Sequence, residues 1–327
     1  MPCSQHRGCD TLFAHELQKS FQPVHLYSLV NVGIDNDLWF CSETHKSLEY
    51  FKPKAGSNVL QEDSTIHQIS AYNEDIFVKS EALFVQDEWS NNYFHWVCDV
   101  LPKLILLKCY FGSDMPPVML KASLRCENLS FIADSLASLG IKSFFQPHDR
   151  RMLINKLYSM HGIASSGNYL SRLMRLTART FVSLAASVRS GGSEMIYISR
   201  GVSGRRIILN EFALRSMISQ LGYITITLDS ISFDEQVSLF HGCKFLLGVH
   251  GAGLTNMMWM KPRSNILEIR RRNDAKNNCY FSLASSLLHR YFYCEADQTF
   301  GESLANDECL TIDLPRLREE ILFMHSK

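Results

Sequence analysis

The stretch Phe245-Leu-Leu-Gly-Val-His-Gly-Ala-Gly-Leu-Thr-Asn256 joins a short apolar run to a turn of small residues and then to the start of a helix. Because Gly248, Gly251 and Gly253 have no side chains, the amides of the turn and of the following helix can come close to a phosphate. His250 adds a protonatable donor. The glycine spacing matches neither the dinucleotide fingerprint nor the P-loop. The segment therefore predicts a strand, a turn and a helix, with the turn either binding an anion or needing glycine only for packing.

The chain around this turn alternates short apolar runs with amphipathic segments. Strands are predicted at residues 195–199, 223–228, 245–249, 265–270 and 291–294, and helices at 210–221, 232–241, 254–260, 278–288 and 314–325. Strands separated by single helices are typical of a parallel sheet built from βαβ units. Ligands of such sheets bind beyond the carboxyl ends of the strands, where the strand order reverses.

The first half of the chain predicts a second α/β domain behind a β-rich lead-in at residues 1–80. Its strands are expected at 82–85, 118–120, 142–145 and 152–160, and its helices at 92–110, 127–139 and 169–188. The segment Arg189-Ser-Gly-Gly-Ser193 is small and polar, which favours a linker. We therefore expect an N-terminal domain at 1–190 and a C-terminal domain at 191–327.

The composition is that of a globular protein, with 46% hydrophobic and 20% charged residues among 327. Lys and Arg together number 33, as do Asp and Glu, so no overall charge favours nucleic acid as a partner. We find no signal peptide and no apolar run long enough to span a membrane. The ten cysteines are scattered without a C-x-x-C pair, which indicates reduced thiols. We expect a cytoplasmic protein with at most peripheral contact with the inner face of a membrane.

A histidine and a carboxylate share one face of the helix predicted at 92–110. His95 and Asp99 are four residues apart, so their side chains can share a proton. Either residue can be a general base with the other as its orienting partner, and an ordinary polar pair beside an apolar stripe remains equally open. Pro102 should kink the helix or restart it at Leu101.

Charged residues also follow other predicted strands. Arg200, Arg205 and Arg206 come after the strand at 195–199, where guanidinium groups suit phosphate contacts or simply form a solvated loop. Glu268, near the end of the next strand after the glycine turn, can accept from ribose hydroxyls or form a structural ion pair with Arg270 or Arg271.

The sequence offers little support for a metal site. Asp35-Asn-Asp37 has the D-x-D form of metal-dependent sugar-nucleotide enzymes, but without further ligands a loop turn explains it better. No group of His, Cys and Asp residues has convincing metal-ligand spacing. We therefore expect no metal and no bound cofactor.

Three separated blocks together resemble glycosyltransferase family 61, whose bacterial members are often labelled capsular polysaccharide biosynthesis proteins. The first is the N-Y-F-H-W-x-x-D-x-L-P-K helix at 92–103, the second is Y-I-S-R…R-x-I-x-N-E at 197–211, and the third is S-F-x-E-Q…G-x-H-G-A-G-L-T-N…L-E-I at 232–269. The resemblance implies a GT-B architecture, with two Rossmann-like domains facing a cleft. It also implies inverting, metal-independent transfer from a nucleotide sugar, which we expect to be a UDP-sugar, in the biosynthesis of a surface or capsular polysaccharide.

The resemblance also implies roles for individual residues. Asp99, with His95, looks like the base on the acceptor side, and the acceptor is expected to be a glycan or a lipid-linked saccharide. The glycine turn looks like the site of the donor diphosphate. The implied donor contacts are Arg200, Arg205, Glu235, Gln236, His250, Gly251, Ala252, Gly253, Leu254, Asn256 and Glu268. Two other classes of protein stay open, a nicotinamide-dependent oxidoreductase and a sugar-nucleotide-binding protein without catalysis.

Overall fold

The computed structural model describes residues 2–5, 10–16, 24–35, 38–41, 77–125, 129–147, 151–161, 167, 169–185, 193–201, 206–299 and 309–327. The chain divides into two compact units. Gln22–Ile163 forms one, here the N-terminal unit, and Met1–Phe21 with Ala164–Lys327 forms the other, the C-terminal unit. The expected division lay near residue 190, and the expected linker at 189–193 falls mostly outside the described residues.

Helix α4 (Ser171–Leu184) explains why the compact units divide before residue 190. Its strongly amphipathic face buries Leu173, Met174 and Phe181. The helix packs on α6, α7 and η8 of the C-terminal unit, and Phe181 makes edge contacts with the rings of Phe233 and Trp259. An amphipathic helix is stabilised by the core against which its apolar face packs. Because that core lies in the later half of the chain, α4 is part of the C-terminal unit.

The C-terminal unit is built on a seven-stranded sheet of order β8-β13-β12-β11-β10-β7-β9. The strands are β7 (Met195–Ile198), β8 (Ile207–Ile208), β9 (Ile224–Ile226), β10 (Phe245–Val249), β11 (Asn265–Arg271), β12 (Arg290–Thr299) and β13 (Cys309–Thr311). Neighbours from β9 through β12 pair in parallel, whereas β13 is antiparallel to β12. The predicted parallel sheet is therefore confirmed, with β8 and β13 as additional edge strands.

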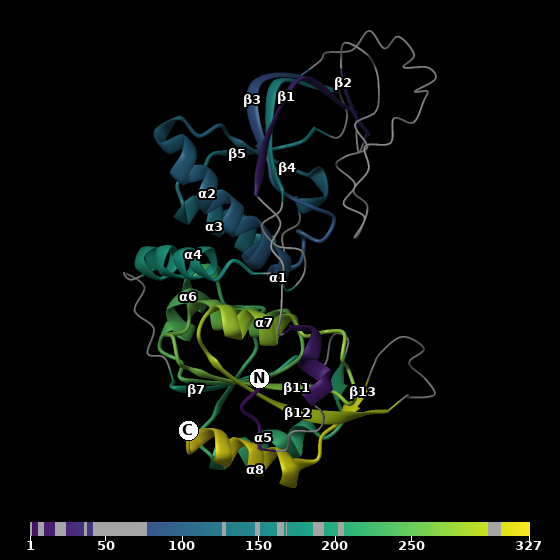
Figure 1. The fold of residues 1–327 in the computed structure, drawn as a ribbon, viewed down its shortest axis with the longest axis vertical. Coiled ribbons are helices and arrows are strands. Elements are labelled where there is room, and N and C mark those ends of the chain that lie inside the picture. The colour runs from purple at the N-terminus through teal and green to yellow at the C-terminus, as the bar shows by residue number, and fades with distance from the viewer. Residues whose placement is uncertain are drawn as a thin grey trace. The chain divides into compact units, whose positions relative to one another are not determined.

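Helices cover both faces of this sheet. They are α5 (Glu211–Gln220), α6 (Phe233–His241), η8 (Ala252–Trp259), α7 (Cys279–Ser286) and α8 (Leu314–His325), with the short η1 (Asp10–Glu16) from the start of the chain. Figure 1 shows α5 and α8 on one face and α4, α6 and α7 on the other. The helix expected at 254–260 is the 3-10 helix η8, which begins earlier than predicted.

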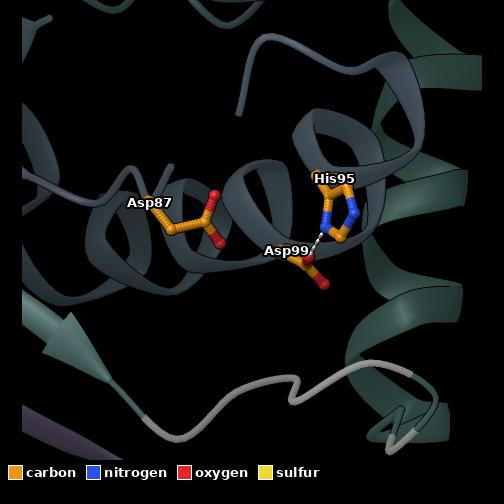
Figure 2. A group of neighbouring side chains, drawn as sticks. All are labelled: Asp87, His95 and Asp99. Carbon is orange, nitrogen blue, oxygen red and sulfur yellow. Dashed lines mark hydrogen bonds and ion pairs between the residues drawn. The ribbon is translucent and has the colours of Figure 1, made fainter. Parts of the chain in front are cut away.

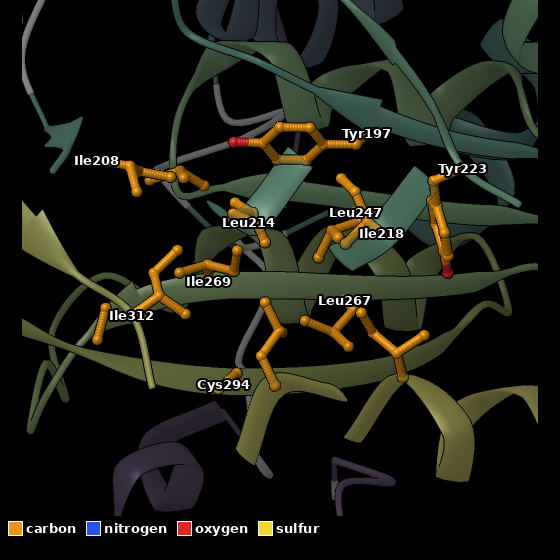
Figure 3. Packing of buried hydrophobic residues seen from close by; sticks show 14 of the residues in the cluster. Tyr197, Ile208, Leu214, Ile218, Tyr223, Leu247, Leu267, Ile269, Cys294 and Ile312 are labelled. Carbon is orange, nitrogen blue, oxygen red and sulfur yellow. The ribbon is translucent and has the colours of Figure 1, made fainter. Parts of the chain in front are cut away.

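The side chains of the central strands alternate between the two faces. Leu247, Leu267 and Ile269 point toward α5, where they pack with Leu214 and Ile218 in a fully buried cluster (Figure 3). The alternate positions of β10 and β11 face the helices on the other side. Because the period is two, Glu268 lies on the face opposite to Leu267 and Ile269.

The N-terminal unit has a six-stranded mixed sheet of order β2-β1-β6-β3-β4-β5. Its strands are β1 (His25–Asp35), β2 (Leu38–Cys41), β3 (Phe77–Phe84), β4 (Val118–Leu120), β5 (Ser143–Phe145) and β6 (Met152–His161). Strands β6, β3, β4 and β5 are parallel, and β1 is antiparallel to both of its neighbours. Val32, Trp39, Phe84, Met119 and Ile154 belong to its core.

One interrupted helix carries the first sequence block. It runs through α1 (Tyr93–His95), the π-helix η3 (Trp96–Val100) and α2 (Leu101–Phe111). The N–H of Leu101 bonds to the carbonyl of Trp96, a widened turn, and α2 begins there as the sequence predicts because Pro102 cannot continue the α-helical ladder.

Short helices complete the N-terminal unit. They are η4 (Gly112–Asp114), η5 (Ala122–Leu124) and α3 (Ser130–Ser138). None of the helices in the described part of the chain is long and apolar enough to cross a membrane.

Candidate active site

The strand order of the C-terminal sheet reverses next to β7. The chain passes from β7 through β8 and α5 to β9 on one side, and then through α6 to β10 on the other side of β7. A pocket of about 200 Å³ lies at the carboxyl ends of these three strands, lined by residues 198–200, 228–229, 249 and 251–254. This is the place where sheets of this kind hold ligands. The structure thereby brings together five sequence-predicted residues, Arg200, Gly251, Ala252, Gly253 and Leu254.

The three glycines of the turn serve different purposes. A methyl group on Gly248 would lie 3.0 Å from Leu254, and one on Gly253 would lie 3.1 Å from Ile198, so both glycines allow close packing. A methyl group on Gly251 would instead overlap the guanidinium of Arg200. Gly251 has an extended backbone (φ 163°), so its small size and not its conformation is what the site requires.

Two arginines converge on this turn. Nη1 of Arg200 donates to the backbone carbonyl of His250 at 2.9 Å, and Nη1 of Arg206 donates to the same oxygen. Burial lowers the pKa of Arg200, and the nearby charge of Arg206 lowers it further. Arg206 has a left-handed backbone (φ 66°), an uncommon conformation for a residue with a side chain. Arg205 lies outside the described residues.

His250 and Glu268 form an ion pair beneath the turn. Nδ1 of His250 bonds to Oε1 of Glu268, and the hydroxyl of Tyr291 donates to Oε2 of the same carboxylate. Glu268 is fully buried, and burial raises its pKa, but His250 and Arg270 outweigh that cost and leave the pKa below its usual value. The pocket lining does not include His250, whose ring packs edge-on against Tyr280.

The other predicted donor residues form internal networks. Gln236 donates to the carbonyl of Ile231 and accepts from Asn256, which also bonds to the carbonyl of Gly253 and the indole of Trp259. These contacts fix η8 behind the glycine turn.

Glu235 closes a capping box at the start of α6. Its Oε2 accepts from the backbone N–H and the hydroxyl of Ser232, at 3.0 and 2.7 Å. Hydrogen bonding to Ser232 lowers the pKa of this exposed carboxyl.

In the N-terminal unit, His95 and Asp99 meet on one helix face as the sequence predicts. Nδ1 of His95 lies 2.8 Å from Oδ2 of Asp99. The other oxygen, Oδ1, is buried and has no hydrogen-bond partner among the described residues. Burial raises the pKa of Asp99, and the bond to His95 opposes that rise. A buried carboxylate with one unused oxygen and a raised pKa is suited to accept a proton.

Two neighbours of this pair were missed by the sequence analysis. Asp87, just after β3, has a carboxylate oxygen within 4.8 Å of the ligand atoms of His95 and Asp99 (Figure 2), and the three side chains could hold a cation. Lys103 is partly buried and donates to the carbonyl of Val85 at 3.0 Å. Loss of solvent lowers its pKa, and the charges of Asp99 and Asp87 oppose that shift. Lys103 stands in the first sequence block, whereas no local pattern marks Asp87.

The fold and the pocket define an α/β protein with a glycine turn at the switch point of a parallel sheet. The sequence profile of the family described as Glycosyltransferase 61 matches residues 93–267, which is more than half of the chain. The chain therefore belongs to glycosyltransferase family 61. No curated protein matches it. The matched span begins at α1 and ends in β11, so it includes both the Asp99 pair and the pocket.

Proposed function

We propose that the protein is an inverting, metal-independent glycosyltransferase of GT-B type that uses a UDP-sugar. The donor assignment rests on Arg200 and Arg206, which both donate to the carbonyl of His250 beside the pocket that the glycine turn lines. Arg200 donates to a neutral carbonyl and has no carboxylate among the groups that shift its pKa, so its positive charge is available for an anion. The first amides of η8 add partial positive charge at the same place.

The departing diphosphate is the group that this arrangement would stabilise. As the bond between the anomeric carbon and the phosphate oxygen breaks, negative charge accumulates on the leaving UDP. Arg200, Arg206 and the amides that follow Gly251 are held in place before the reaction, so they need little reorganisation to receive that charge. This supports transfer without a metal.

Asp99 is the proposed base on the acceptor. Its unused Oδ1 would take the proton from the attacking hydroxyl while the hydroxyl oxygen bonds to the anomeric carbon, opposite to the leaving group. His95 would hold Oδ2 and offset the carboxylate's charge. The acceptor is proposed to be a glycan or lipid-linked saccharide of a surface polysaccharide, with the enzyme in the cytoplasm.

A thermal-shift panel tests the donor assignment. The purified chain is heated with UDP, UDP-glucose, UDP-galactose, UDP-N-acetylglucosamine, UDP-xylose, GDP and NAD, and Arg200→Ala serves as the control. A ligand at 100 times its dissociation constant adds about 2.7 kcal/mol to stability. We expect stabilisation by uridine nucleotides that is lost in the variant. Stabilisation by NAD alone would favour an oxidoreductase, and donor binding without hydrolysis or transfer would favour a non-catalytic protein.

A further inference from the structure

The pocket at the switch point contains a carboxylate that the sequence patterns do not mark. Asp229 follows β9 and is exposed, and it lines the pocket together with Arg200 and Gly251. It is the only acidic residue among the described residues of that lining. An acid beside a proposed diphosphate site needs an explanation, because its charge repels phosphate.

Glu268 does not provide the hydroxyl-binding acid that the sequence suggests. The carboxylate is fully buried, and its two oxygens bond to His250 and Tyr291. A ribose could reach Glu268 only if those bonds broke and the strand were exposed. Asp229 is then the one carboxylate in the described lining of the pocket that is open to ligand hydroxyls.

The position of Asp229 in the sheet matches that task. β9 lies directly beside β7, and the two strands run parallel, so Asp229 and Arg200 emerge at the same edge of the sheet. In dinucleotide-binding folds an acidic residue beyond the phosphate turn accepts hydrogen bonds from ribose. Here the phosphate turn follows β10, on the other side of β7, and Asp229 faces the same pocket.

We infer that Asp229 binds a hydroxyl pair of the nucleotide sugar, on its ribose or its sugar, and so selects such donors over phosphate anions without hydroxyls. The inference rests on the proposed function. A carboxylate has two acceptor oxygens, and each hydroxyl of a diol has a proton to donate. A ligand with hydroxyls replaces the repulsion with charge-assisted hydrogen bonds, whereas pyrophosphate meets only the repulsion.

Calorimetric titration of the wild-type chain, Asp229→Ala and Asp229→Asn tests this inference. The ligands are pyrophosphate, UDP, 2′-deoxy-UDP and the UDP-sugar that stabilises the wild type most. Asp297→Asn is the matched control, because Asp297 is exposed, pairs with Arg272 and does not line the pocket. We expect Asp229→Ala to bind the UDP-sugar at least tenfold more weakly. The same variant should bind pyrophosphate equally well or more tightly.

Weaker UDP-sugar binding without weaker pyrophosphate binding separates recognition from structural damage, because a collapsed pocket would bind pyrophosphate less tightly as well. If Asp229 binds the ribose hydroxyls, the wild type binds 2′-deoxy-UDP more weakly than UDP, and the Asp229 variants bind the two nucleotides equally. If the sugar is the source, both nucleotides bind alike and only the UDP-sugar is affected. Unchanged UDP-sugar affinity, or a parallel loss for pyrophosphate, would overturn the inference while leaving the proposed donor intact. A wild-type chain that binds no nucleotide sugar would overturn both.

Discussion

His250 and Glu268 are joined side chain to side chain in the core of the C-terminal unit, while the carbonyl of the same histidine accepts hydrogen bonds from Arg200 and Arg206. The ion pair therefore fixes the backbone on which two arginines are anchored. His250 contributes through its carbonyl and not as a residue of the pocket lining. We interpret Glu268 as a positioning residue for the arginines.

Glu268→Gln should reduce both stability and UDP affinity. Removing the charge leaves His250 and Arg270 without their carboxylate in a dry interior, and breaking a buried pair costs about 3–5 kcal/mol. Tyr291→Phe removes the bond to Oε2 and the bond that Arg270 donates to the hydroxyl, but it keeps the carboxylate and its contact with His250. Its loss of stability should therefore be smaller, about 1–2 kcal/mol, and its UDP affinity near normal. Urea unfolding and calorimetry measure the two effects. Full UDP affinity in a folded Glu268→Gln protein would rule out the positioning role.

Gly251→Ala should weaken donor binding without straining the backbone. The added methyl group displaces the guanidinium of Arg200, whereas the extended backbone at residue 251 tolerates any side chain. The loss should approach that of Arg200→Ala, about 1.5–3 kcal/mol. The double variant decides the mechanism, because adding Gly251→Ala to Arg200→Ala should cost nothing more if both act through the same group. Additive losses would mean that the glycine serves the ligand directly.

Hydrophobic periodicity predicted much of the C-terminal fold. The predicted strand at 245–249 is β10, and the predicted helix at 314–325 is α8. β10 is buried on both faces and is an unbroken apolar run, whereas α8 buries one face and has apolar residues at helical spacing, so both patterns are local. β13 was missed because it is a three-residue antiparallel strand whose place depends on its neighbours.

The site was predicted less completely, because most of its contacts join residues that are distant in the sequence. The pairing of His95 with Asp99 follows from helical spacing and could be predicted. The partner of Glu268 is His250, in the glycine turn after β10, and Asp87 comes near Asp99 through the turn that joins β3 to α1. Asp229 reaches the pocket because β9 lies beside β7, which no local pattern reveals. Tertiary contacts decide such roles.

Stability should depend on pH through His289. Burial lowers its pKa to about 4 from a usual 6.5, while Nε2 donates to the carbonyl of Met257. The unfolded chain therefore binds the proton more tightly, and the stability present above pH 6.5 is lost as the pH falls toward 4. We expect a loss of about 2 kcal/mol between pH 7.5 and pH 5. His289→Gln keeps a donor and should flatten this slope in urea unfolding. An unchanged slope would contradict the assignment.

Activity should survive chelation. The proposed stabilisation of the leaving group uses arginines and amides, so EDTA should leave transfer unchanged, and Asp35→Asn and Asp37→Asn should be active. Asp87 provides the sharper test, because it could hold a cation with His95 and Asp99. Asp87→Asn should retain most activity if Asp87, His95 and Asp99 act without a bound metal. Activity that disappears with EDTA and returns with manganese would replace the metal-independent mechanism.

Asp99→Asn should abolish transfer and leave UDP affinity intact, because the base acts on the acceptor and the nucleotide pocket belongs to the other unit. A general base contributes about 10²–10⁴-fold, so kcat should fall by at least the lower bound. The raised pKa of Asp99 places the acid limb of kcat/KM above pH 3.8, and the asparagine variant should lose that limb.

His95→Ala should be milder if histidine only orients the carboxylate, and equally severe if histidine is the base. Asp114→Asn is the control, since Asp114 is an exposed carboxylate of the same unit. Product stereochemistry by NMR tests inversion in the same assays. Near-normal turnover by Asp99→Asn would mean that the His95–Asp99 pair has only a structural role in the helix, because the group that accepts the proton cannot be replaced by an amide without loss of rate.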